Sequence, residues 1–474
     1  MPNLNGYHRI IQNKVPIYIK SEQPDWIIPT PQADRFLCLY KQSDTLSQAI
    51  YAYQDLYQDE NVDYKARRLL FHLSNNKVEN YQGRIHYHLP NSLKECWFHL
   101  TNQCNMDCGY CMFKNYPKKN NELTKEQIFK IIKEVYKLGT RIFYFTGGEP
   151  FVYPYFREVI EKILGLPHTH AVILSNGKAV SHFSSWLSTL SKKRVHFQVS
   201  VDGNQKIHDT FRGKGAYVEL KRNLINLLKI GFPVTLAMCV NRVNLKEMVL
   251  LVQIAEKLAV KNIHYLWLFR KGGAKEEKKI NSKLIFQELI KAYKLAQEKN
   301  IFIDNMEIIK SQIFSLPGTR FDLSNAGWES LAISPEGYIY PSPALIFEKE
   351  LSAGHISEGI KNIWLKSSVF KKIRKTSLIN NNLEQRDAMK FLIGGGDMDH
   401  SYIAGGHFVG HDPYRKLYSQ VALYLLSQEV QKYPCKDIGI ICRMGDRLYR
   451  CEATDSPVQF THSNCVLSLP EEDY

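Results

Sequence analysis

The sequence predicts an α/β protein with a partial (β/α)6 barrel at its centre, a winged-helix-like unit before it and an α+β extension after it. Strand-like and helix-like segments alternate six times between residues 92 and 300, which is the pattern of a parallel sheet covered by helices. Four of these strands end in short polar or glycine-rich motifs, at the end where parallel barrels carry their ligand sites. The chain has 474 residues, too many for one ordinary core. We therefore expect units at residues 1–88, 92–300 and 301–474.

The barrel unit is expected to contain six parallel strands and six helices. Apolar runs predict strands near residues 96–101, 142–146, 171–175, 195–201, 233–239 and 262–268. Apolar residues at three- and four-residue spacing predict helices near 124–138, 154–164, 181–191, 216–230, 245–258 and 281–298. A six-unit barrel stays open on one side, so it would admit a peptide substrate.

The first unit is expected to hold two or three strands followed by three helices. Residues 15–20 alternate like a strand, and residues 24–29 form a second short strand bounded by prolines. A helix is expected to begin near Pro31, and Thr45 is expected to cap the next one. A third helix would contain the apolar residues at 69, 70 and 73. This order of elements is that of a small winged-helix unit.

Three cysteines directly after the first barrel strand are the strongest chemical signal. Cys104, Cys108 and Cys111 are spaced C-x3-C-x2-C. Thiolates on one short, curved loop suit three irons of a 4Fe–4S cluster. The fourth iron would stay open, and an open iron can bind S-adenosylmethionine. A zinc site or a chance spacing is the alternative for these cysteines taken alone.

Further motifs follow in order at the predicted strand ends. The run 142–150 ends in Gly147-Gly148-Glu149-Pro150, and the next strand ends in Ser175-Asn176. A fourth strand ends in Ser200 and Asp202, and the run 208–213 contains Arg212. With Tyr110 just before the third cysteine, this set resembles the radical S-adenosylmethionine (radical SAM) superfamily.

The resemblance implies a set of cofactors and site residues. It implies a 4Fe–4S cluster and S-adenosylmethionine as cofactors, with an electron donor of the flavodoxin or ferredoxin type. In that superfamily the glycine edge at Gly147 and Gly148 hydrogen-bonds the amino group of the methionine moiety. Ser200 and Asp202 stand where relatives contact the ribose, and Arg212 is expected to reach the cofactor carboxylate. The remaining expected cofactor-binding residues are Tyr110, Glu149, Ser175 and Asn176.

The first unit is similar to the PqqD-like recognition element of enzymes that modify ribosomally made peptides. The similar parts are the strand, Trp26, the proline and the following helix. Such elements bind a leader peptide as an added strand at an exposed sheet edge. A nucleic-acid-binding role and a purely structural role are the alternatives. Because no basic recognition helix stands out, nucleic acid is not an expected partner.

The extension departs from the family that it resembles. Residues 331–345 look like the start of a SPASM extension, which binds auxiliary 4Fe–4S clusters through seven cysteines. Six of those positions carry other residues here, which predicts a scaffold without its usual clusters. They are Ser324, Ser342, Glu384, Asp387, Ile393 and Asp397.

Four cysteines near the end of the sequence are a separate candidate metal set. They are Cys435, Cys442, Cys451 and Cys465. Their wide spacing matches no tight metal-binding knuckle. An auxiliary iron–sulfur cluster, a zinc ion and free thiols remain open for them.

A glycine-rich run at 393–414 carries three aspartates and three histidines that would suit a metal or a proton transfer. They are Asp397, Asp399, His400, His407, His411 and Asp412. Capped turns would give a similar composition, and we favour that interpretation. If a general base lies outside the barrel, Asp397 or Asp399 is the best candidate. The run 271–283 is expected to be a solvated helix face.

Composition narrows the class of protein further. The net charge of +15 favours an acidic partner such as an acidic peptide or a nucleic acid, although a basic surface alone would give the same value. No stretch reaches the ~18–20 apolar residues of a membrane span, and the first residues lack an apolar signal core. Ten cysteines without such a signal are typical of metal ligands and free thiols in a reducing cytoplasm.

Together these features predict a radical SAM peptide maturase. A 5′-deoxyadenosyl radical would abstract a hydrogen from a ribosomally made precursor peptide, leading to a cross-link, an epimerisation or a related change. Two alternatives remain open. One is a sulfatase-type maturase, and the other is a non-catalytic zinc- or peptide-binding protein.

Overall fold

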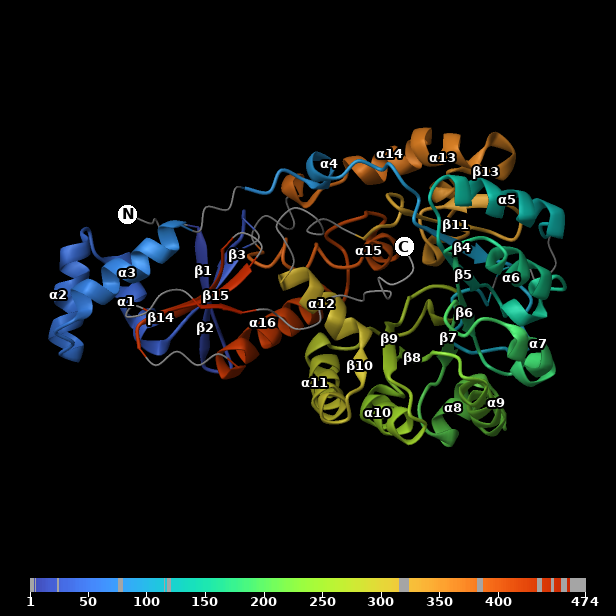
Figure 1. Cartoon of the computed structure of the whole chain (residues 1–474), viewed down its shortest axis with the longest axis horizontal. Helices are drawn as coiled ribbons and strands as arrows, with labels where there is room; N and C mark the ends of the chain where they lie inside the picture. Colours follow the sequence, from blue (N-terminus) through green and yellow to red (C-terminus); the bar gives the residue numbers. More distant parts are fainter. Residues whose placement is uncertain are drawn as a thin grey trace.

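The structure is a computed structural model of the whole chain (Figure 1). It describes residues 4, 6–23, 25–75, 80–114, 116, 121–314, 324–381, 387–432, 437–444, 447–452 and 458–460. Within these residues the strands form two sheets, one of six strands and one of ten. The six-stranded sheet lies on the left of Figure 1 with the first helices, and the ten-stranded sheet forms the barrel on the right.

The barrel sheet confirms the predicted α/β class. Its order is β10-β9-β8-β7-β6-β5-β4-β11-β12-β13, and β4 to β9 run parallel to their neighbours. The six strands are β4 (Glu95–His99), β5 (Ile142–Thr146), β6 (His170–Ser175), β7 (Val195–Ser200), β8 (Val234–Val240) and β9 (Asn262–Trp267). The covering helices are α5 (Lys125–Lys137), α6 (Phe156–Leu164), α7 (Ser184–Thr189), α9 (Ala216–Ile230), α10 (Met248–Lys257) and α11 (Ser282–Glu298).

Alternation along the strands separates a helix-covered face of this sheet from an inner face. Phe143 and Phe145 of β5 are fully buried, whereas Tyr144 between them is half-exposed. Because successive strand residues point to opposite faces, the phenylalanines pack under the helices and Tyr144 lies on the inner face. There its ring stacks on Trp97 of β4 at 3.9 Å between centroids. The inner face of the partial barrel therefore carries an aromatic pair and is only partly covered.

The first unit has the predicted strand and helix order, with one more strand than the sequence placed. It contains β1 (Tyr7–Gln12), β2 (Val15–Lys20), β3 (Asp25–Pro29), α1 (Pro31–Gln42), α2 (Leu46–Tyr57) and α3 (Val62–Asn75). Thr45 caps α2 through a reciprocal capping box with Gln48, as its position predicted. Asn13 and Lys14, between β1 and β2, have φ of 52° and 65°. Two left-handed residues form the tight hairpin turn that the strand twist favours.

The expected third unit is divided between the two sheets. Its first part extends the barrel sheet through β10 (Phe302–Ile303), β11 (Ser330–Ile333), β12 (Tyr338–Tyr340) and β13 (Gly354–His355). Its last strands, β14 (Gly439–Met444), β15 (Arg447–Glu452) and β16 (Val458–Phe460), instead continue the sheet of the first unit in the order β1-β2-β3-β14-β15-β16. The predicted boundary at residue 301 therefore does not separate two folding units. The reason is burial: Ile440 and Cys442 of β14 complete the apolar layer under α1 and α3.

The remaining described helices lie in both halves, and α16 contacts the two. They are α4 (Arg84–Tyr87), α8 (Gln205–Arg212), α12 (Asp304–Phe314), α13 (Ile360–Lys366), α14 (Ser368–Lys375), α15 (Met398–Gly405) and α16 (Arg415–Lys432). Helix α16 packs against β2 on one side and against α11 and α12 on the other, as Figure 1 shows at its centre. Trp26 of β3 donates its indole N–H to the carbonyl of Ile313 at 2.9 Å. No helix within the described ranges is both long and apolar enough to cross a membrane.

Candidate active site at the cysteine loop

The loop that carries the three cysteines begins where β4 ends. Its backbone pairs with the segment after β5, because Gly148 N–H donates to Thr101 O at 2.7 Å and Glu149 N–H donates to Gln103 O at 2.9 Å. A Cβ atom on Gly148 would overlap the carbonyl of Gln103, and Gly147 has a φ of +140°. The glycine pair is therefore required for close approach of two backbone segments. Its contact with a ligand stays a prediction.

The three thiols are half-exposed and free of disulfides. Burial raises the pKa of Cys104 to about 11 and also raises the pKa values of Cys108 and Cys111. The three thiols lie within electrostatic range, because the charges of Cys108 and Cys111 raise the pKa of Cys104 further. No three His, Cys, Asp or Glu side chains in the described part of the chain converge as a preformed metal site. Three thiols on one loop still fit the donor set of an iron–sulfur cluster, whose binding would deprotonate them.

A cationic side chain lies beside this loop. Arg212, at the end of α8, lowers the pKa values of Cys108 and Cys111 and so partly offsets the effect of burial. Its guanidinium donates from Nε to Asp202 Oδ2 at 2.6 Å and from Nη2 to the Tyr110 hydroxyl at 2.6 Å. Tyr110 in turn donates to Asp202 Oδ2 at 2.5 Å. The sequence predicted these three residues as separate cofactor contacts, and the structure brings them together as one hydrogen-bonded triangle.

Asp202 retains one unused acceptor at the end of β7. Its side chain is fully buried, and within the described part of the chain Oδ1 has no hydrogen-bond partner. A buried carboxylate oxygen without a donor is costly unless a ligand supplies one. This orphan oxygen fits a ligand hydroxyl such as those of a ribose. Ser200, two residues earlier, is half-exposed on the inner face of the barrel.

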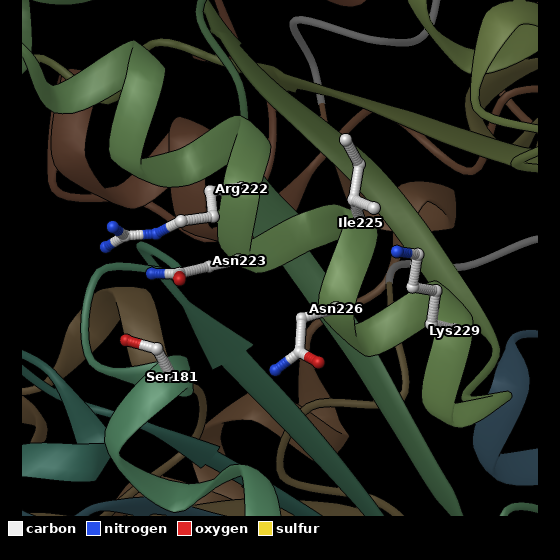
Figure 2. A pocket seen from close by; sticks show the side chains of 6 residues that line it. All are labelled: Ser181, Arg222, Asn223, Ile225, Asn226 and Lys229. Carbon is white, nitrogen blue, oxygen red and sulfur yellow. The ribbon is translucent and has the colours of Figure 1, made fainter.

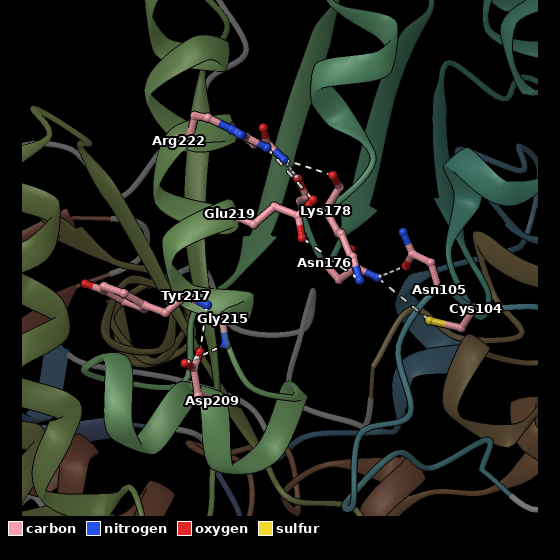
Figure 3. Close-up of polar contacts among 11 residues, drawn as sticks. Cys104, Asn105, Asn176, Lys178, Asp209, Gly215, Tyr217, Glu219 and Arg222 are labelled. Carbon is pink, nitrogen blue, oxygen red and sulfur yellow. Dashed lines mark hydrogen bonds and ion pairs between the residues drawn. The ribbon is translucent and has the colours of Figure 1, made fainter.

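A second network joins the ends of β5 and β6. The carboxylate of Glu149 accepts from the Ser175 hydroxyl at 2.8 Å and from Asn176 N–H at 2.9 Å. Burial raises the pKa of Glu149 to about 7. Figure 3 shows that the Asn176 side chain reaches the cysteine loop, donating to Asn105 Oδ1 at 2.8 Å and to Cys104 Sγ at 3.7 Å. These residues position the first cysteine.

The polar contacts of Figure 3 continue away from the cysteines onto α9. Lys178 and Arg222 each lie 4.0 Å from the carboxylate of Glu219. Asp209 of α8 accepts from the backbone N–H groups of Gly215 and Tyr217 and so fixes the turn between α8 and α9. These contacts hold the outer helices rather than a ligand.

The same helix borders a surface pocket of about 360 Å³ (Figure 2). Five of its lining residues come from α9, and Ser181 faces them from the turn before α7. They are Arg222, Asn223, Ile225, Asn226 and Lys229. The pocket contains no predicted site residue and lies on the outer, helical side of the barrel. Its basic and amide lining suits a surface contact, and it is not the candidate active site.

Sequence reasoning missed the segment that covers the cysteine loop from β9. Gly273 N–H donates to Cys111 O at 2.9 Å, and a Cβ on Gly272 would overlap the carbonyl of Met112. Lys271 is buried, and its Nζ binds the carbonyl of Ile346 at 2.7 Å and Glu348 at 2.8 Å. The expectation of a solvated helix face from residue 271 is therefore wrong at its start. A Gly-Gly pair after a barrel strand was the available signal.

Cys239 is a second residue that the sequence analysis did not single out. It lies at the C-terminal end of β8, and its thiol is within electrostatic range of Cys108, Cys111 and Asp202. Burial raises its pKa well above the usual range of a thiol. Its place at a strand end was visible in the sequence, but a single cysteine gave no spacing to interpret.

The two candidate proton acceptors have different environments. Asp397 caps α15 by accepting from His400 N–H at 2.8 Å. Asp399, two residues later, lies near Ser342 and Lys271 at the barrel mouth, and its Oδ1 has no partner within the described residues. Burial and the neighbouring Asp397 raise the pKa of Asp399 to about 8. Asp399 therefore combines a raised pKa with a buried oxygen that has no partner among the described residues.

The rest of the glycine-rich run forms capped turns and stacked rings. Asp412 accepts from Asp397 N–H at 2.6 Å and from Tyr414 N–H at 2.7 Å. His400 stacks on Phe269 at 3.8 Å between centroids, and His407 stacks on His411. The described residues here do not gather into a metal site. The hydrogen bonds that Asp397 and Asp412 accept from backbone N–H groups are contacts of the kind that capped turns make.

The six positions without cysteine have structural contacts of their own where they are described. Asp387 accepts from Met389 N–H at 2.9 Å and pairs with Arg415, Ile393 is buried in the core, and Ser342 is buried beside Asp399. Ser324 forms part of the turn before β11. Glu384 lies outside the described residues. These contacts are consistent with a scaffold that does without ligands at those positions.

Two of the four C-terminal cysteines come together. Cys442 of β14 and Cys451 of β15 are both buried, and their thiols are hydrogen-bonded to each other. They lie in the apolar layer between the six-stranded sheet and α1 to α3. Cys435 and Cys465 lie outside the described residues. The choice among a cluster, zinc and free thiols thus stays open.

The comparison with protein families shows which superfamily the region around this site matches. Residues 98–255 match the radical SAM superfamily. The chain therefore contains a radical SAM domain, and this domain spans the cysteine loop, the glycine pair and the Tyr110–Asp202–Arg212 triangle. A 4Fe–4S cluster and S-adenosylmethionine are the cofactors of such domains.

Curated relatives of this radical SAM domain include a bacteriocin biosynthesis protein and a killing-factor maturation protein. The antilisterial bacteriocin subtilosin biosynthesis protein AlbA of Bacillus subtilis (strain 168) is 27% identical over 267 residues, which cover 55% of this chain and 56% of AlbA. The sporulation killing factor maturation protein SkfB of the same strain is 26% identical over 290 residues, covering 58% and 65%. The chain thus spans little more than half the length of these relatives.

The similarity to solved structures covers more of this chain than the radical SAM domain alone. Streptococcus suis SuiB bound to the precursor peptide SuiA has a TM-score of 0.56 and 13% identity, covering 86% of this chain and 100% of SuiB. The protein anSMEcpe with bound AdoMet and Cp18Cys peptide has a TM-score of 0.59 and 14% identity, covering 72% and 99%. At such identities the likeness shows the shared fold.

Proposed function

We propose that this protein is a radical SAM enzyme that modifies a ribosomally made precursor peptide. One observation carries the proposal. A loop of three free thiols packs directly against the Gly147–Gly148 edge and the Arg212–Asp202 pair within a domain whose relatives include AlbA and SkfB. The names of these relatives, a biosynthesis and a maturation protein, favour a peptide substrate.

The proposed role of the protein is to hold the cofactors and to position the peptide. Cys104, Cys108 and Cys111 would hold the cluster, and Asn176 would fix the first of them. Asp202 Oδ1 would accept a hydrogen bond from a cofactor hydroxyl. When bound, the cluster and S-adenosylmethionine supply a carbon-centred radical that abstracts a hydrogen atom. The half-exposed inner face with Trp97 and Tyr144 would exclude water around the target residue.

Asp399 is the proposed proton acceptor for the step after hydrogen abstraction. Its free oxygen lies at the mouth of the barrel, near Lys271 and Ser342. Asp397 is committed to capping α15, so we propose a positioning role for it, by raising the pKa of Asp399. A carboxylate with a pKa near 8 is a stronger base than an ordinary aspartate, and the fraction that is deprotonated rises toward pH 8.

The first unit is the proposed binding element for the leader segment of the precursor. Its three strands and three helices support this assignment, and the net charge of +15 favours an acidic leader. A flavodoxin or ferredoxin in a reducing cytoplasm would deliver the electron.

The test begins with the cofactors. After anaerobic reconstitution, the protein should contain about four irons and four sulfides per chain if only the cluster of the cysteine loop forms. Dithionite reduction with S-adenosylmethionine should release 5′-deoxyadenosine. A variant with alanine at all three cysteine positions should lose both signals while keeping its circular dichroism spectrum. Release of 5′-deoxyadenosine by that variant would contradict the proposal.

The substrate requires a second experiment. The short open reading frame nearest the gene is co-expressed with this chain, and its peptide product is examined by mass spectrometry. We expect a mass change that depends on the three cysteines. An unchanged peptide, with active cofactor cleavage, would rule out that product as the substrate and count against the maturase proposal.

A further inference from the structure

The six-stranded sheet does not offer an incoming strand the β3 edge that the first unit alone would have. The edge of β3 is occupied, because β14 pairs with it antiparallel through Ile440↔Pro29, Ile441↔Ile28 and Cys442↔Ile27. The outer strands of the described sheet are β1 and β16. Strand β16 has three residues, Val458–Phe460, whereas β1 has six, Tyr7–Gln12. The longer open edge is therefore that of β1.

Strand β14 is not a loosely attached cover of β3. Ile440 and Cys442 are buried in the layer under α1 to α3, and Ile441 is buried on the opposite face with α16. Thr30 N–H also donates to Gly439 O at 2.9 Å. Displacing β14 would expose apolar side chains on both faces of the sheet. A peptide that binds to this unit as a strand would meet less resistance at β1.

The register of the β1–β2 hairpin shows which backbone groups of β1 point outward. Gln12 and Val15 flank the two-residue turn and form a hydrogen-bonded pair, as such turns require. Because hydrogen-bonded and non-bonded pairs alternate in an antiparallel ladder, Ile10 also faces β2. The N–H and C=O groups of Arg9 and Ile11 then point away from the sheet.

Two independent contacts confirm this register. Ile11 is paired with Pro16 of β2, which has no N–H and fits only a non-bonded position. Tyr7 should likewise point outward, and its N–H donates to Leu4 O at 3.2 Å instead of to β2. For the outward groups of Arg9 and Ile11, no hydrogen-bond partner is found among the described residues.

The chemistry of this edge favours an acidic, extended peptide. Residues 7–14 carry Arg9, Lys14 and His8 and no acidic side chain. Arg9 is already paired with Asp34 of α1 at 2.6 Å, whereas exposed Lys14 forms no ion pair within the described residues. The side chain of Ile11 is 57% exposed on the same face as Arg9. The edge thus combines free backbone groups, a free cation and one apolar side chain.

We propose that the leader segment of the precursor, an acidic peptide, binds by adding a strand to β1 through the backbone of Arg9 and Ile11. This proposal rests on the proposed function, because it names the edge by which that function would recruit its substrate. It also explains how strand addition is compatible with a sheet whose β3 edge is filled by the chain itself.

The first experiment removes one outward N–H. A fluorescein-labelled peptide covering the N-terminal half of the product of the nearest short open reading frame is titrated with the reconstituted full chain, and anisotropy gives the dissociation constant. Ile11→Pro removes the outward N–H and is expected to weaken binding about tenfold, the value of one hydrogen bond. Ile11→Ala loses the side chain but keeps the N–H, so we expect a loss below about threefold. Equal binding by wild type and Ile11→Pro would overturn the proposal.

A second measurement covers the case in which Ile11→Pro disturbs the fold. A benzophenone amino acid replaces Ile11 in one variant and Tyr51, which is 73% exposed on α2, in another. Irradiation should cross-link the peptide to position 11 and not to position 51. Cross-linking only at a benzophenone placed at Gln459 of β16 would assign the other edge and overturn the proposal. Wild type that binds no peptide, yet releases 5′-deoxyadenosine, would refute the leader site while leaving the radical SAM chemistry intact.

Discussion

At the scale of single residues, the polar side chains at the strand ends form hydrogen bonds with one another. Arg212, Asp202 and Tyr110 form a closed triangle, and Glu149 ties Ser175 to Asn176. A buried charge is stable only when it is paired, so these networks are needed for folding as well as for ligands. A side chain suited to a ligand differs from the others in having a buried carboxylate oxygen with no hydrogen-bond partner among the described residues. Asp202 and Asp399 each have such an oxygen.

The pH dependence of peptide modification should report Asp399. Its pKa is raised to about 8 by burial and by Asp397, while Ser342 and Lys271 act in the opposite direction. A base works only when deprotonated, so the single-turnover rate should rise with pH up to about 8 and then level off. Asp399→Asn should lower the rate at pH 8 by about 10²-fold or more and remove this rising limb.

The matched control for this prediction is Asp209→Asn. Asp209 accepts two backbone N–H groups at the turn after α8. This variant should keep the pH profile of the wild type. A rising limb that persists in Asp399→Asn would show that another group is the base.

At the scale of elements, the cysteine loop is positioned by backbone contacts with two glycine pairs. Gly147 and Gly148 support it from β5, and Gly272 and Gly273 cover it from β9. In each case a side chain would collide with a carbonyl of the loop. The shape of the site therefore depends on the absence of four Cβ atoms as much as on the side chains that are present.

Gly148→Ala should loosen this loop. The new Cβ would overlap the carbonyl of Gln103, and overpacking of this kind costs about 1–3 kcal/mol. We expect a lower free energy of unfolding in denaturant titrations and fewer irons retained per chain after gel filtration.

Gly109→Ala is the control within the same loop. A Cβ there meets no atom within 4 Å, and the backbone is not left-handed. Its free energy of unfolding should stay within about 0.5 kcal/mol of wild type. If Gly148→Ala is as stable as Gly109→Ala, the close approach is not a constraint.

At the scale of the whole molecule, the two sheets are joined by α12, α16 and the return of the chain to β3. Trp26 of β3 reaches α12, where its ring also meets Phe314 edge to face. Buried Lys390 pairs with Glu22 in the turn before β3 at 2.6 Å. A leader bound to the first unit would thus be held at a fixed place relative to the barrel.

Trp26→Phe should weaken this junction. The variant leaves the buried carbonyl of Ile313 without its indole donor, and an unsatisfied buried acceptor costs about 1–3 kcal/mol. We expect a fall of this size in the free energy of unfolding. In contrast, Trp186→Phe removes an exposed hydrogen bond to Glu161 and should cost about 0.5 kcal/mol or less. Equal effects of the two variants would mean that the junction bond contributes nothing.

Much of the fold and part of the site could be predicted from the sequence. All six barrel strands and their covering helices were predicted close to their observed bounds, because apolar periodicity and glycine or proline stops are local signals. The C-x3-C-x2-C spacing could likewise be recognised from the sequence as a candidate cluster-binding loop. Cys239, Lys271 and the Gly272–Gly273 pair were missed, because each acquires its meaning only from a neighbour distant in sequence.

The sequence by itself determined the class of the domain and the order of its motifs. The hydrophobic period, the turn residues and the cysteine spacing can each be read from a short stretch of neighbouring residues. Only the tertiary structure decided that β14 returns to fill the edge of β3, that Asp202 and Arg212 share Tyr110, and that Asp397 caps a helix while Asp399 keeps a free oxygen. These outcomes depend on which segments bury each other's surfaces. Burial is a property of the whole chain, and no local pattern encodes it.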